Sequence, residues 1–125
     1  MPETSHAPMT GLELAHRCVQ FAQEKKASDP IIMDLRTIST ICDYLVICSA
    51  QSEPQIKAIV NEVEKAIKDE QGRPPLAVDG FPTSQWVVMD YGDVMVHVFH
   101  EQKRGVYGLE DLWGDAPQVR VVRGV

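Results

Sequence analysis

Three aspartates stand at or beside the ends of short apolar runs, where paired carboxylates could do chemistry: Asp34, Asp43 and Asp90. Two such carboxylates could hold a divalent cation, and a metal ion held there could assist nucleotidyl transfer. That reaction also needs a glycine-rich loop, a helix N-terminus or basic side chains for the polyphosphate. The candidate stretch SAQS, residues 49–52, has neither glycine nor lysine. Since aspartates at strand ends are usually turn residues or caps, a metal-dependent nucleotidyltransferase is the alternative hypothesis.

Other reactive groups give no stronger signal. No serine lies in a GxSxG motif. The three cysteines are odd in number and form no CxxC pair, which favours buried thiols in a reducing compartment. His97 and His100 are three residues apart on an expected strand, so they point to opposite faces and do not form a metal-binding pair. We expect His97 to be a partly buried structural side chain, and we expect no catalytic residue, cofactor or metal.

The elements that position these residues alternate in a way typical of a sheet covered by helices. Thr10 and Glu13 form a capping box before a helix over about residues 11–26. Ser52 and Gln55 form another before a helix with one apolar stripe. A last helix is expected after residue 101, and the strands are expected at 31–35, 44–48, 76–78, 86–90 and 94–99. This order predicts an α/β or α+β fold with a mixed sheet of about five strands.

The stretch DYGDVMVHVFH, residues 90–100, predicts a β-hairpin with two different faces. A two-residue turn at Tyr91 and Gly92 would pair Asp90 with Asp93. One face then carries Val87, Met89, Val94, Val96 and Val98, and we interpret it as core. The other face carries a large aromatic residue with acids near the turn, which is typical of an interface. A helix that covers this face is an equally weighted alternative. The residues of this second hairpin face are Trp86, Val88, Met95, His97 and Phe99.

Charge and length narrow the class of partner. Eighteen acidic residues against twelve lysines and arginines give the 125-residue chain a net charge of −6. Binding to a phosphate backbone needs clustered cations, so we expect no direct sequence-specific nucleic-acid binding; a basic protein partner suits the charge better. No apolar segment reaches the roughly 20 residues of a membrane helix, and residues 1–9 lack the features of a secretory signal. We therefore expect a cytoplasmic protein with no membrane segment.

The length allows one domain. We expect it to span residues 10–116, between a flexible N-terminal tail at 1–9 and a C-terminal tail at 117–125. The C-terminal tail is interpreted as either loose or an added edge segment of the sheet.

Four stretches resemble the ribosomal silencing factor family, whose members are also called Iojap-like proteins. They are ICDYLVICSAQS at 41–52, VDG at 78–80, WVVMDYGDVMVHVFHEQKR at 86–104 and YGLEDLW at 107–113. The chain departs from the family at Cys42, where members more often have threonine, and at Ser49–Ala50, near which they have Thr-Gly. These departures concern loop geometry.

The resemblance implies a fold similar to that of nucleotidyltransferases, without their glycine-serine and paired-aspartate catalytic motif. It implies binding to the large ribosomal subunit through ribosomal protein L14, a steric block to small-subunit joining, and repression of translation when nutrients are short. It also implies a homodimer when free. A dimeric adaptor with a partner other than the ribosome is the further alternative. The expected partner-binding residues are Trp86 and Tyr91 as anchors, Asp90, Asp93 and Glu101 as an acidic rim, and Arg104 and Tyr107 at the border.

Overall fold

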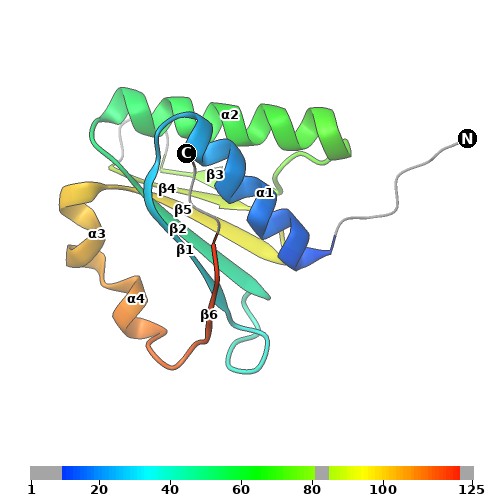
Figure 1. Ribbon diagram of the computed structural model, residues 1–125, viewed down its shortest axis with the longest axis vertical. Coiled ribbons are helices and arrows are strands. Elements are labelled where there is room, and N and C mark those ends of the chain that lie inside the picture. The colour runs from blue at the N-terminus through cyan, green and yellow to red at the C-terminus, as the bar shows by residue number, and fades with distance from the viewer. Residues whose placement is uncertain (1–9, 81–84, 122–125) are drawn as a thin grey trace, which may run out of the picture.

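The computed structural model describes residues 10–80 and 85–121, and within them helices pack on both faces of one sheet (Figure 1). The helices are α1 (Gly11–Glu24), α2 (Glu53–Gln71), α3 (Glu101–Tyr107) and α4 (Leu109–Leu112). The strands are β1 (Ser28–Asp34), β2 (Tyr44–Ala50), β3 (Ala77–Asp79), β4 (Trp86–Asp90), β5 (Val94–His100) and β6 (Gln118–Val119).

The sheet is mixed, and the predicted α+β class is confirmed. Its order is β3-β4-β5-β2-β1-β6. Strands β2 and β5 run parallel, whereas the other neighbours run antiparallel. The sheet has one strand more than expected because Gln118 and Val119 pair with Met33 and Ile32 at the edge. The segment after Pro117 therefore begins as an edge strand of the sheet, one of the two interpretations given for it, and the domain boundary at residue 116 stays a prediction.

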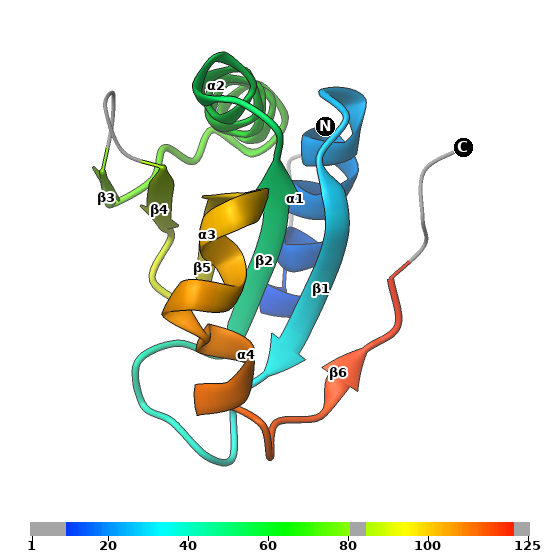
Figure 2. The ribbon, with the colours of Figure 1, turned by 90° about the vertical axis from the view of Figure 1, so that its left-hand side faces the viewer.

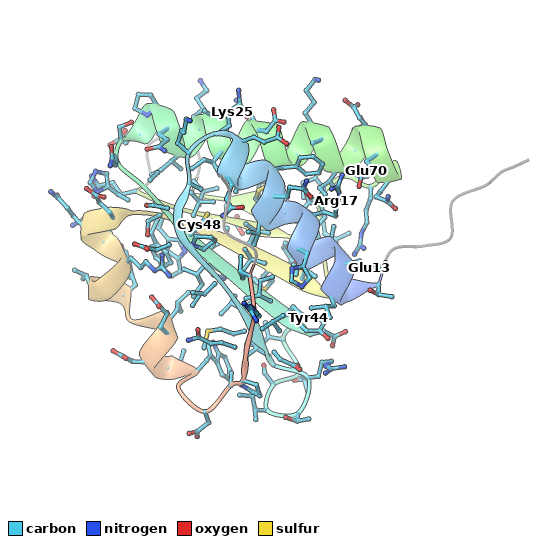
Figure 3. The ribbon with its side chains drawn as sticks, in the orientation of Figure 1. Glu13, Arg17, Lys25, Tyr44, Cys48 and Glu70 are labelled. Carbon is cyan, nitrogen blue, oxygen red and sulfur yellow. The ribbon has the colours of Figure 1, made fainter. Side chains whose placement is uncertain are left out.

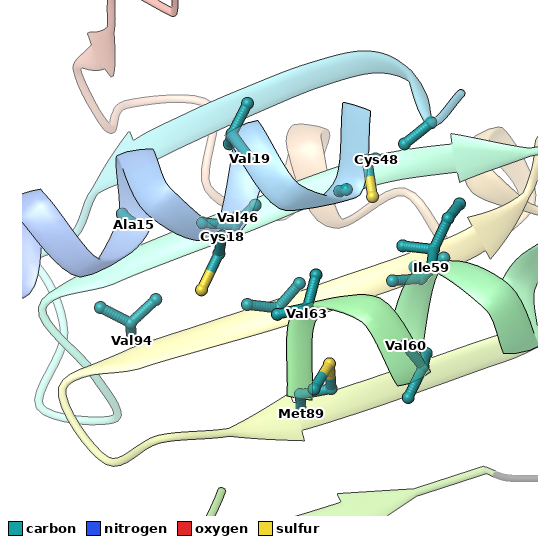
Figure 4. Packing of buried hydrophobic residues seen from close by; sticks show 14 of the residues in the cluster. Ala15, Cys18, Val19, Val46, Cys48, Ile59, Val60, Val63, Met89 and Val94 are labelled. Atoms are coloured by element: carbon teal, nitrogen blue, oxygen red, sulfur yellow. The ribbon is translucent and has the colours of Figure 1, made fainter. Parts of the chain in front are cut away.

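Helices α1 and α2 cover one face of the sheet, and α3 and α4 lie on the other (Figures 1 and 2). The apolar stripe predicted for α2 is buried against the sheet. The valine-rich face of the hairpin packs beneath the same two helices (Figure 4). An ion pair between Arg17 on α1 and Glu70 on α2 joins the helices at their solvent side (Figure 3). The predicted core face is thus confirmed.

The helix starts follow the predicted capping signals with one difference. The capping box of α1 is present in full. At α2, Ser52 accepts a hydrogen bond from the Gln55 N–H at 3.2 Å, but the Gln55 side chain does not return to Ser52. It accepts from the Gln51 N–H at 2.7 Å and donates to the carbonyls of Lys25 and Lys26. Gln55 therefore joins the start of α2 to the end of α1, and half of the predicted capping box is wrong.

The single helix predicted after residue 101 is two short helices. Gly108 lies between them with φ +63°, a left-handed conformation that ends α3 and begins α4. Glycine adopts this conformation without the steric cost that other residues meet. The helical spacing of the apolar residues spans the break, which is why the pattern predicted one helix.

The hairpin has the predicted faces but a different register. Trp86 pairs with Phe99 and Asp90 with Met95. The turn residues are therefore Gly92 and Asp93, with Gly92 at φ +92°. Moving a two-residue turn by one position shifts the register by two, and an even shift leaves every side chain on its face. The predicted pairing was wrong, and the predicted faces are confirmed.

Within residues 10–80 and 85–121, no helix has both the length and the apolar character needed to cross a membrane.

Candidate partner-binding face

The sheet face opposite α1 and α2 is covered unevenly. One row of cross-strand neighbours runs from Ile47 on β2 through His97 and Val88 to Asp79 on β3. Ile47 and His97 are buried, Val88 is half-buried and Asp79 is exposed. Helix α3 packs over β5 and β2, and β3 and β4 lie beside it (Figure 2). In a second row the side chains also become more exposed from β2 to β3. Its residues are Leu45, Met95, Asp90 and Ala77.

We call the uncovered part of this surface the open sheet face. Its residues come from β3, β4, β5 and the end of α3. They are Trp86, Val88, Met95 and Tyr107, with Asp79 and Asp90 beside them.

Trp86 lies at the centre of an aromatic cluster on this face. Its ring stacks on Phe99 with centroids 5.0 Å apart and touches Tyr107 at 4.4 Å. Its indole N–H donates a hydrogen bond of 2.9 Å to Nδ1 of His97. Trp86 is half-buried by these contacts, and Tyr107 remains 49% exposed. Helix α3 therefore flanks the tryptophan without sealing it. The alternative of a covering helix holds in part, and the alternative of an interface stays a prediction.

His97 is a buried, neutral acceptor. Its side chain is 7% exposed, and burial lowers its pKa from 6.5 to about 4. Because Nδ1 accepts from the Trp86 indole, the ring proton belongs on Nε2. The expectation that His97 is hydrogen-bonded within the fold is confirmed, and its side chain is more deeply buried than expected.

Tyr91 is in the core and not at the surface. It is 2% exposed and packs among the buried residues beneath α1 and α2, with the Arg73 guanidinium 5.8 Å from its ring centre. Burial raises the pKa of its hydroxyl. The expected role of Tyr91 as an exposed anchor is wrong. Strand alternation contained the signal, since Tyr91 continues the series Val87 and Met89.

The predicted acidic rim is only partly free. Asp93 forms an ion pair of 2.6 Å with Arg73, so much of its charge is neutralised within the chain. Asp90 is half-buried, and its Oδ1 accepts the Gly92 N–H at 2.7 Å in the hairpin turn. Glu101 is exposed in the first turn of α3. Asp79 is an exposed acid beside Val88 that the sequence reasoning did not select, although it lies in the VDG stretch.

Arg104 holds the fold together and does not border the open sheet face as a free cation. Its side chain is only 12% exposed. Its Nη1 donates to the carbonyl of Asp29 at 2.7 Å and to Oγ of Ser49 at 2.9 Å. Its Nε donates to the Glu110 carboxylate at 2.8 Å. Arg104 therefore fastens α3 to β1, β2 and α4.

Asp34 and the three cysteines have surroundings that disfavour a catalytic role. Asp34 accepts two hydrogen bonds from the Arg36 guanidinium, at 2.9 and 2.7 Å, which lower the pKa of the Asp34 carboxyl. Burial raises the pKa of Cys18 and Cys48 to about 12 and that of Cys42 to about 11, so their thiolates are disfavoured. Among the residues that the structure describes, no three His, Cys, Asp or Glu side chains lie close enough to hold a metal ion.

Comparison with known proteins identifies the family. The family model "Ribosomal silencing factor during starvation" matches residues 8–124. The chain is 41% identical over 113 residues to "Ribosomal silencing factor RsfS" of Halalkalibacterium halodurans, covering 90% of this chain and 96% of that one. It is also similar to a crystal structure of a Chromobacterium violaceum protein, with a TM-score of 0.81, 27% identity and coverage of 93% and 95%.

A more distant relative comes from mouse. "Mitochondrial assembly of ribosomal large subunit protein 1" is 27% identical over 97 residues, covering 76% of this chain and 42% of that one. The matched family consists of ribosomal silencing factors, so the expectation that the chain is not an enzyme is confirmed. The nucleotidyltransferase alternative is not supported. The chain belongs to the ribosomal silencing factor RsfS family.

Proposed function

We propose that this protein binds the large ribosomal subunit through ribosomal protein L14, with the open sheet face as its contact surface. Bound there, it blocks the approach of the small subunit and represses translation when nutrients are limiting. The observation that carries the proposal is a half-buried tryptophan on an uncovered sheet face of an acidic chain. Family membership supplies the ribosome as the target.

The chemistry of the face supports a basic protein partner. Trp86 and Tyr107 offer a rigid aromatic surface, and Val88 and Met95 extend it along the strands. Aromatic side chains that enter a partner pocket often dominate binding energy. Asp79 and Asp90 lie beside this apolar area, where they would steer and orient a cationic partner more than they would add affinity.

The mechanism is occlusion. No bond is made or broken, and the protein competes with the small subunit for one surface of the large subunit. The degree of inhibition then depends on the concentration and the affinity of the factor.

Co-sedimentation with isolated large subunits tests the proposal, followed by addition of small subunits. The wild-type protein is expected to sediment with large subunits and to reduce the yield of whole ribosomes. Trp86→Ala should weaken binding by at least about thirtyfold, the loss typical of a central anchor. Phe21→Ala is the matched control, because Phe21 is a half-buried aromatic residue on α1 behind the sheet. Undiminished formation of whole ribosomes at excess wild-type protein would exclude the function.

We also propose that the free protein is a homodimer in the cytoplasm. The family resemblance motivates both parts, and a small domain gains stability when it buries additional surface. Analytical ultracentrifugation over a range of concentrations tests the dimer, and a monomer at all concentrations would exclude it. Cell fractionation tests the compartment.

A further inference from the structure

The hydrogen bond between Trp86 and His97 joins the surface of the protein to its core. The donor side chain is half-buried on the open sheet face, and the acceptor is 7% exposed inside it. The two residues are on adjacent strands, and His97 pairs directly with Val88, next but one to Trp86. The bond is therefore diagonal across the hairpin, from the exposed tryptophan to the histidine beside it.

Among the residues that the structure describes, three groups contact the indole and orient it. Phe99 stacks beneath it at 5.0 Å, Tyr107 flanks it at 4.4 Å, and His97 accepts its N–H at 2.9 Å. Stacking allows a flat ring to slide or turn over, because it fixes a distance more strictly than a direction. A hydrogen bond is directional, so His97 determines which edge of the indole faces inward.

We infer that His97 is a positioning residue for partner binding: it accepts the Trp86 N–H and so presents one defined edge of the indole on the open sheet face, without touching the partner itself. This inference rests on the proposed function. Its physical basis is preorganisation, since a side chain that is ordered before binding loses less conformational entropy when the partner arrives. Burial keeps His97 neutral near neutral pH, which leaves Nδ1 available as an acceptor.

The test separates the effect of the hydrogen-bond acceptor of His97 from the effect of its aromatic ring. His97→Phe keeps an aromatic ring and removes the acceptor, whereas His97→Gln loses the ring and keeps an acceptor oxygen. Affinity for isolated large subunits is measured for each variant in two backgrounds, wild type and Trp86→Phe. We expect His97→Phe to weaken binding about tenfold with Trp86 present, and His97→Gln to weaken it less than about threefold. In the Trp86→Phe background, which has no indole N–H, both substitutions should change the affinity by less than about twofold.

A spectroscopic readout accompanies the affinities. The indole N–H resonance of Trp86, assigned by its loss in Trp86→Phe, should shift and exchange faster with solvent in His97→Phe. His16→Phe is the matched control on α1, behind the sheet, and it should alter neither the resonance nor the affinity. If His97→Phe does not fold, His97→Leu, which also removes the acceptor, replaces it in the affinity measurements in both backgrounds and in the resonance measurement with Trp86 present.

Two results would overturn the inference. One is an unchanged affinity in a folded His97→Phe protein. The other is an equal loss in both backgrounds, which would mean that His97 acts only through general stability. Failure of the proposed function is seen separately, because wild-type protein would then not sediment with large subunits at all.

Discussion

Trp86 and Tyr91 belong to the same hairpin, and strand alternation places their side chains on opposite faces. Trp86 lies on the open sheet face, while Tyr91 is in the core with its hydroxyl buried. The aromatic type alone did not distinguish the anchor from the core residue. Position parity did, because residues two apart on a strand share a face. The burial of each of these two side chains therefore follows from its position on the hairpin and not from its aromatic type.

Removing the Tyr91 hydroxyl should not destabilise the protein. Among the described residues the hydroxyl has no hydrogen-bond partner, so it has lost its hydration without compensation. We expect Tyr91→Phe to leave the free energy of unfolding unchanged or to raise it by up to about 1 kcal/mol, measured by urea denaturation. Tyr107→Phe is the exposed control. A loss above about 2 kcal/mol would reveal a partner for the hydroxyl.

Burial of His97 should make stability depend on pH. The folded pKa is about 4 and the ordinary value is 6.5, so between these values the unfolded chain binds a proton that the folded chain does not. Stability is therefore full above pH 6.5 and falls as the pH drops toward 4, by about 3 kcal/mol over the window. Urea denaturation at several pH values checks this, with His97→Gln as the comparison.

The difference between the two pH profiles isolates His97. Asp34 and Glu70 also have lowered pKa values and lose stability on acidification, but they are present in both proteins. Parallel profiles for wild type and His97→Gln would show that His97 does not contribute.

At the scale of elements, α3 and α4 depend on contacts outside themselves. Neither helix contains a buried residue, and a glycine divides them. Short helices are not stable alone, so packing and side-chain bonds must keep them on the sheet. Arg104 supplies these bonds to three other elements. Tyr107, at the end of α3, then lies where it can flank Trp86.

Substitution of Arg104 should loosen α3 and α4 selectively. We expect Arg104→Gln to lower the free energy of unfolding by about 2 kcal/mol, the range for hydrogen bonds to charged groups. Amide hydrogen exchange should become faster in residues 101–113 and stay unchanged in α1 and α2. Lys103→Gln, an exposed neighbour, is the control. Unchanged protection in α3 would indicate that the aromatic packing suffices.

At the scale of the whole molecule, the net charge of −6 acts over a longer distance than any single contact. An exposed ion pair contributes little affinity, but the summed field of an acidic protein accelerates its encounter with a basic surface. Salt screens this field over about 10 Å at 0.1 M. If the field accelerates the encounter, the association rate should therefore depend on the salt concentration.

The association rate with large subunits should fall as salt rises. Between about 50 and about 500 mM salt we expect a decrease of about tenfold in the association rate, with a smaller change in the dissociation rate. Surface-immobilised large subunits and a series of salt concentrations measure both rates. The double variant Asp79→Asn, Asp90→Asn should show a weaker salt dependence, and Glu53→Gln with Glu62→Gln on α2 is the charge-matched control. A rate that does not change with salt would argue against electrostatic steering.

The sequence determined what depends on neighbours along the chain. The apolar stripe of α2 at residues 56–67 and the capping box at Thr10 mark their helices by local spacing. The alternation in β4 and β5 fixed the two faces even though the predicted register was wrong, because an even shift preserves them. The four motif stretches also indicated the family to which the chain belongs.

Only the tertiary structure decided which residues meet across long separations. Arg104 holds α3 in place because Asp29 and Ser49 lie within hydrogen-bond distance of its guanidinium. The charge of Asp93 is partly neutralised because it forms an ion pair with Arg73. Trp86 is half-buried because α3 ends beside it and leaves β3 and β4 open. Burial and ion pairing depend on how elements pack in space, and local patterns of residue type and spacing contain no measure of that packing.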